Sequence, residues 1–121
     1  MDYAKMIDHT LLKPEASETQ IKKLCEEARE YGFHSVCVNS CYVSYCTGLL
    51  KDSDVKVCTV IGFPLGAAST AGKTAEAAAA VKDGAEELEM VINVGIIKSG
   101  DWDNVRRDIE AVDKAPDKAP I

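Results

Sequence analysis

The sequence of 121 residues lacks several features that mark particular classes of protein. It has no cluster of lysine and arginine and a formal net charge of −6, so we expect no binding to nucleic acid or to anionic membranes. No apolar run approaches the roughly 18 residues that a membrane span needs. The first residues, MDYAKMIDHT, show neither the basic nor the apolar segment of a secretory signal, which favours a cytoplasmic protein.

Potential metal ligands are also scarce and poorly spaced. The five cysteines are an odd number, and no two of them form a Cys-x-x-Cys pair. Only two histidines accompany them. A zinc cage is therefore not expected. In a cytoplasmic chain we expect reduced thiols, most of them packed as small apolar groups.

What the sequence does contain is a regular alternation of strand-like and helix-like segments. Strands are expected at residues 5–12, 34–39, 55–63 and 87–94. Helices are expected at residues 18–32, 41–51, 70–84 and 102–115. Ser17 and Gln20 are spaced as a capping box for the first helix, and Gly32 is placed to end it. Asp101 is placed to cap the last helix.

This order of elements predicts a parallel sheet with right-handed crossovers. The strands begin near residues 6, 34, 55 and 87, which is the spacing of a (β/α) barrel. A complete eight-unit barrel needs about 250 residues. Residues 1–115 therefore predict an α/β fold that is half of a TIM (β/α)8 barrel, with four parallel β/α units. Two prolines favour an exposed, flexible tail at residues 116–121.

Glu89 is the least expected residue of the apolar stretch GAEELEMVINVG, residues 84–95. A carboxylate there is costly unless it is paired, hydrogen-bonded or used in chemistry. If it faces the barrel interior, alternation along the strands places other polar side chains on the same face. The whole set is Asp8, Thr10, Cys37, Asn39, Thr59, Glu89 and Asn93. Cys58 and Val60 would then face the helices. Because the polar side chains gather on one face of the sheet, we expect a site at the carboxyl ends of the strands.

Plainer interpretations exist for most of these residues. Asp8 and Asn39 fit turn positions, and Cys37 fits the core as well as a site. Lys73 and Glu76, three residues apart on an expected helix, fit a solvated ion pair. The loop GFPLGAAS matches no phosphate-binding motif.

Several segments together resemble the first half of deoxyribose-phosphate aldolase. They are IDHTLLKP, SVCVNS, VKVCTVIGFPLGA, GAEELEMVINVG and KSGDW, and the match runs from about Met6 to Val112. The resemblance implies a TIM-barrel fold and class I chemistry, in which a lysine forms a Schiff base without a metal or cofactor. The implied reaction is reversible cleavage of 2-deoxyribose 5-phosphate into acetaldehyde and glyceraldehyde 3-phosphate, so any small-molecule partner would be a phosphosugar or an aldehyde.

The resemblance also implies roles for individual residues. Glu89 falls where the family has its proton-relay aspartate, and Asp8 matches the aspartate of the strand-one motif. Thr10 and Asn39 match substrate-side positions, and Cys37 matches a cysteine near the aldehyde site. Asn93 joins them as a substrate-binding candidate because it shares the face of Glu89.

The family's Schiff-base lysine belongs to strand six, which falls outside residues 1–121. The first interpretation is therefore a truncated half-barrel that is deficient in the family reaction. A second is a residual aldolase in which an oligomer uses Lys13 or Lys98. A third is a binding or scaffold module that pairs with another half-barrel chain.

An isolated half-barrel would leave two sheet edges open, which invites association. We expect a homodimer or a higher homo-oligomer in which strand four of each chain meets strand one of the other, closing an eight-stranded ring. Sedimentation velocity at micromolar concentration should give a dimer or a larger species. A compact monomer under these conditions would contradict the expectation.

Overall fold

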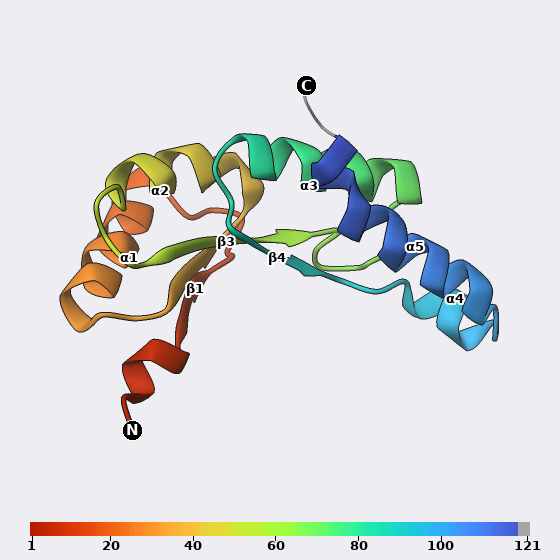
Figure 1. The fold of residues 1–121 in the computed structure, drawn as a ribbon, viewed down its shortest axis with the longest axis horizontal. Coiled ribbons are helices and arrows are strands. Elements are labelled where there is room, and N and C mark those ends of the chain that lie inside the picture. Colours follow the sequence, from red (N-terminus) through yellow and green to blue (C-terminus); the bar gives the residue numbers. More distant parts are fainter. Residues whose placement is uncertain (119–121) are drawn as a thin grey trace.

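The computed structural model describes residues 1–118 and has the expected alternation of strands and helices. Its parallel sheet follows chain order, with strands β1 (Asp8–Leu11), β2 (Ser35–Val38), β3 (Lys56–Ile61) and β4 (Glu87–Met90). The helices are α1 (Glu18–Tyr31), α2 (Val43–Leu49), α3 (Thr70–Lys82), α4 (Val94–Lys98) and α5 (Trp102–Lys114) (Figure 1). Short 3-10 helices cover Tyr3–Met6 (η1), Ser40–Tyr42 (η2) and Ala115–Lys118 (η3). The helices of this part of the chain are too short or too polar to traverse a lipid bilayer.

The helix ends predicted from sequence are confirmed by hydrogen bonds. Ser17 Oγ accepts from the backbone N–H of Gln20, and Gln20 Oε1 accepts from that of Ser17 at 2.9 Å, which completes the capping box of α1. Gly32 ends this helix with φ 68°, a left-handed conformation that suits glycine. Asp101 accepts from the backbone N–H of Asn104 at 3.2 Å and caps α5. Local hydrogen bonding therefore delimits these helices.

The main core lies between the sheet and its helices. Val36, Val38, Val57 and Ile61 project from β2 and β3 into a cluster with apolar residues of the helices, and all four are almost fully buried. Burying such a side chain stabilises the fold by about 1.5–3 kcal/mol. A separate, smaller cluster contains Cys37, Cys58 and Val60, with Leu12 packed against it and no helix residue in it. Among the described residues, one face of the sheet is therefore covered by helices, whereas this smaller cluster lies on the other face.

Two segments differ from the expectation. β4 ends at Met90 instead of continuing to residue 94, because the chain turns into the short helix α4. Asn93 caps that helix, its Oδ1 accepting from the backbone N–H of Ile96 at 3.2 Å. At the other end, residues 116–118, which we expected to begin a tail, belong to η3, and η3 contacts α3. The remaining tail residues, 119–121, lie outside the described residues.

Lys73 and Glu76 do not form the expected solvated pair. Lys73 is fully buried, and its Nζ donates to Asp108 Oδ2 at 2.7 Å because α5 packs over this side of α3. Thr70 Oγ1 donates to the other carboxylate oxygen of Asp108 at 2.6 Å. Glu76 instead accepts from the backbone N–H of Gly62 at 2.7 Å. The two side chains therefore connect α3 to different neighbours, Lys73 to α5 and Glu76 to the loop after β3.

The contacts of Asp108 change its pKa. Burial alone would raise the pKa of this carboxyl, but the hydrogen bonds from Lys73 and Thr70 and the charge of Lys73 hold the pKa below its ordinary value. A depressed folded-state pKa contributes stability that is present above the unfolded-state pKa of about 3.9 and is lost as pH falls through the folded value. The ion pair should therefore stabilise the fold at neutral pH and fail in acid.

Replacing Asp108 by alanine should lower the free energy of unfolding at pH 7 by about 3–5 kcal/mol, because it leaves the buried Lys73 charge without a partner. Urea denaturation measures this change. Arg106→Ala is the matched control on the same helix, since Arg106 is exposed and its loss should cost no more than about 0.5 kcal/mol. Equal effects of the two substitutions would contradict the assigned ion pair.

Candidate functional site

The pairing register of the strands shows which side chains share the face without helices. Paired residues of neighbouring parallel strands project to the same side of the sheet. Cys37 is paired with Cys58, and Val60 is paired with Glu89. Since Cys58 and Val60 are two residues apart on β3, all four side chains lie on one face. We call this face the concave face, because it would line the interior of a closed barrel.

Thr59 corrects the face assignment made from sequence. It belongs to the opposite parity from Cys58 and Val60, so it points toward the helices and not toward Glu89. Its side chain is fully buried, and Oγ1 donates to the backbone carbonyl of Val38 at 2.7 Å. With its hydroxyl satisfied by the neighbouring strand, threonine packs there as a valine would. The expectation that Cys58 and Val60 face the helices was wrong for the same reason.

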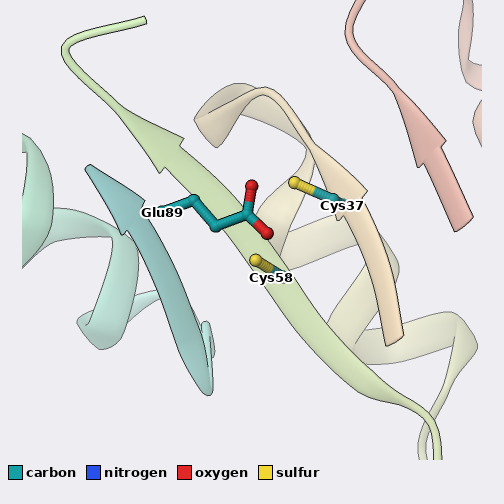
Figure 2. A group of neighbouring side chains, drawn as sticks. All are labelled: Cys37, Cys58 and Glu89. Carbon is teal, nitrogen blue, oxygen red and sulfur yellow. The ribbon is translucent and has the colours of Figure 1, made fainter. Parts of the chain in front are cut away.

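Glu89 forms a compact group with two thiols on the concave face. The sulfur atoms of Cys37 and Cys58 and a carboxylate oxygen of Glu89 all lie within 4.8 Å of one another. Figure 2 shows the Glu89 side chain reaching from β4 across β3 toward both sulfurs. Both cysteines are buried, with 1% and 0% of their surface exposed, whereas Glu89 is exposed. The carboxylate can therefore meet a molecule in front of the sheet, with the thiols behind it.

The electrostatics of this group keep Cys58 protonated. Its hydrogen bond with Cys37 raises the pKa of the Cys58 thiol, and burial and the charges of Cys37, Glu89 and Glu87 raise it further. A thiol held neutral is a poor nucleophile. Among the three side chains, the accessible carboxylate of Glu89 is the group equipped to accept and return a proton.

Asp8 lies in a different part of the concave face. Ser35 Oγ donates to Asp8 Oδ1 at 2.6 Å, and Asp8 also lies near His34 and Glu87. His34 Nε2 is 2.9 Å from Glu87 Oε2. Asp8 is paired with Ser35 at the amino ends of β1 and β2. Glu89 lies farther toward the carboxyl ends of the strands, because it is paired with Val60, two residues after Cys58 on β3. The residues described here thus do not bring Asp8 and Glu89 together.

The remaining candidates lie near the ends of the strands and are engaged in local hydrogen bonds. Thr10 Oγ1 donates to the backbone carbonyl of Asp8 at 2.8 Å, and its side chain is exposed on the concave face. Asn39 Nδ2 donates to the carbonyl of Leu12 at 3.2 Å, which ties together the loops after β1 and β2. Asn93 has left the strand to cap α4 and lines a pocket of about 220 Å³ with residues of the α3 N-terminus and α5.

The loops after β3 and β4 are in direct contact at the carboxyl edge of the sheet. Gly66 has φ 69°, and its N–H donates to the carbonyl of Gly62 at 2.7 Å. A Cβ atom on Gly66 would overlap the backbone carbonyl of Ile92. Only glycine allows this approach. The loop GFPLG, which includes a cis peptide between Phe63 and Pro64, is thereby seated against the segment that follows Glu89.

Cys58 is the site residue that the sequence prediction missed. A signal for it exists, because Val36-Cys37 on β2 and Val57-Cys58 on β3 repeat the same dipeptide. If the two strands are paired so that these dipeptides match, as they are in the structure, both cysteines fall on one face. Assigning the polar Thr59 to the interior face places its neighbour Cys58 on the opposite face, so the two assignments exclude each other.

Consecutive parallel strands with helices on one face define a fold class, the β/α barrels, of which this chain forms part. Comparison with known proteins makes the class specific. The family model of the DeoC/LacD family aldolases matches residues 3–121. The chain belongs to this family.

Curated relatives and solved structures agree with the family. The deoxyribose-phosphate aldolase of Thermoanaerobacter pseudethanolicus is 61% identical over 115 residues, which cover 95% of this chain and 52% of the relative. A Coccidioides immitis protein assigned as a deoxyribose-phosphate aldolase superimposes with a TM-score of 0.94 at 43% identity, over 98% of this chain and 47% of that one. The tetrameric deoxyribose-phosphate aldolase of Aeropyrum pernix superimposes with a TM-score of 0.80 at 34% identity. The match covers 93% of this chain and 48% of that one.

The chain thus spans about half the length of the curated relatives it matches. Its four β/α units correspond to half of the barrel in the solved structures, which confirms the half-barrel predicted from sequence.

The burial of the thiols predicts their reactivity. Cys41 is the exposed cysteine, and the other four are buried. A bulky disulfide reagent at neutral pH should therefore modify one thiol per chain quickly, and the rest only when the chain unfolds. Cys41→Ser should remove the fast phase. A fast phase that persists in this variant would contradict the burial of Cys37 and Cys58.

Proposed function

We propose that this chain supplies the first half of a class I aldolase barrel of the deoxyribose-phosphate aldolase type, with Glu89 as its proton-relay carboxylate. The observation that carries the proposal is the exposed Glu89 carboxylate on the concave face, at the position where the resemblance has the relay aspartate. A carboxylate in that position can move a proton to and from a substrate carbon or oxygen. Asp8, Thr10, Cys37, Asn39 and Asn93 are proposed as the remaining site residues of this half.

Glutamate at position 89 has a physical consequence for the relay. Its side chain is one methylene longer than aspartate, so its carboxylate reaches farther from β4. A displacement of about 1 Å in a catalytic group can change a rate by roughly 100-fold. We therefore propose that Glu89 serves a slightly different proton path from that of an aspartate, and that it reaches over Cys58 to do so.

Residues 1–121 on their own are proposed to be deficient in aldol cleavage. Lys73 is fully buried beside Asp108 on the helix side of the sheet, so its amine is not available on the concave face. Lys13 and Lys98 are exposed, without the enclosed setting that a Schiff-base lysine needs. The nucleophile of the proposed reaction must therefore come from the other half of the barrel.

Self-association and a cytoplasmic location complete the proposal. In the described sheet β1 and β4 each pair with one neighbouring strand, which leaves an edge on each for a second half-barrel. The tetrameric Aeropyrum pernix aldolase gives a precedent for oligomers in the family. Five free cysteines suit a reducing compartment.

The test joins residues 1–115 to the second half of the Thermoanaerobacter relative and measures cleavage of 2-deoxyribose 5-phosphate. The joined barrel should be active, and Glu89→Gln should lower kcat by about 100-fold or more because the relay carboxylate is lost. Glu87→Gln is the matched control on the same strand and should change kcat much less. Equal activity of Glu89→Gln and the parent barrel would contradict the proposed role.

The unjoined chain tests the proposed deficiency. Borohydride reduction in the presence of acetaldehyde traps a Schiff base as a covalent adduct, which intact mass spectrometry detects. We expect no adduct on residues 1–121. A stoichiometric adduct at Lys13 or Lys98 would instead favour the residual aldolase and contradict the deficiency.

A further inference from the structure

We infer that Cys37, Cys58 and Glu89 form a binding site for a thiophilic divalent cation of the zinc and cadmium class. The inference goes beyond the proposed function, since it requires neither a substrate nor the second half of a barrel. It starts from the position of two sulfur atoms and one carboxylate oxygen within 4.8 Å of one another, on three adjacent strands (Figure 2).

The distances are close to those of a bound ion. Zinc binds sulfur at about 2.3 Å and carboxylate oxygen at about 2.0–2.2 Å, so tetrahedral ligands lie roughly 3.5–3.8 Å apart. From separations of at most 4.8 Å, each pair of these atoms therefore needs to approach by no more than about 1.0–1.3 Å. The two cysteines are held in register on paired strands, and the exposed Glu89 side chain is free to rotate.

The chemistry of the three ligands selects the ion. Thiolates prefer zinc and cadmium over magnesium and calcium, and a carboxylate completes many zinc sites. Binding replaces two S–H bonds by two metal–sulfur bonds and releases two protons to the solvent, with no change of oxidation state. Two protein thiolates and one carboxylate leave the fourth position to water. The neighbouring Glu87 adds negative charge near the site without being a ligand.

Two other groups of side chains serve as comparisons within the same chain. Asp8, His34 and Glu87 also lie within ligand distance of one another, but they offer no sulfur, and His34 and Glu87 already pair at 2.9 Å. Cys25 and Cys46 are a second buried pair of thiols in contact, located in the core between α1 and α2. No carboxylate or histidine joins them in a group of three among the described residues. Within residues 1–118, only the concave-face group combines two thiols with an accessible carboxylate.

The experiment titrates the reduced chain with cadmium and follows the ultraviolet charge-transfer absorption of cadmium thiolates. We expect saturation at one ion per chain, with two protons released in an unbuffered solution. Cys37→Ser should abolish the absorption at stoichiometric cadmium. Glu89→Gln should weaken binding on the order of 10-fold to 100-fold or more, since even outer-shell partners of a metal contribute that much.

Cys46→Ser and His34→Gln are the matched controls, because they alter the two comparison groups. Both should bind cadmium as the parent chain does. Circular dichroism establishes that each variant is folded, and Glu89→Gln keeps the test decisive if a cysteine variant unfolds, since Glu89 is exposed. The inference is overturned if the parent chain gives no charge-transfer band, if Cys46→Ser removes the band, or if Glu89→Gln leaves the affinity unchanged.

Discussion

The parallel register of four short strands is the constraint on which the rest of the structure depends. Because paired residues project to the same side, the register sends Val36, Val38, Val57 and Ile61 toward the helices. It sends Cys37, Cys58, Val60 and Glu89 toward the other face. A slip of one residue in β3 would exchange Cys58 for Thr59 and place a hydroxyl beside the carboxylate. The composition of the concave face is therefore a property of pairing as much as of sequence.

Much of the fold could be predicted from sequence because its signals are local. The Ser17–Gln20 capping box, the left-handed Gly32 and the Asp101 cap need only neighbouring backbone groups, so spacing was enough to find them. Glu89 could be found because a carboxylate among apolar strand residues is costly without a purpose. These predictions rest on chemistry within a few residues of the chain.

The errors share a cause, which is that a polar side chain can be satisfied by a partner distant in sequence. Thr59 reaches the carbonyl of Val38, Lys73 reaches Asp108 on α5, and both are buried where sequence reasoning expected a lumen residue or a solvated one. Asn93 has a partner close in sequence instead, because its side chain caps α4. The spacing of apolar residues in the sequence did not predict this short helix. In each case the hydrogen-bond partner decides whether a polar residue marks a site.

Both proposals depend on the same arrangement on the concave face. The Glu89 carboxylate that would relay protons lies beside the thiols of Cys37 and Cys58. Nuclear Overhauser contacts in solution test this arrangement most directly. The account predicts contacts from the β-protons of Cys37 and Cys58 to the γ-protons of Glu89. Contacts from the Thr59 methyl group to Glu89, with none from either cysteine, would contradict it.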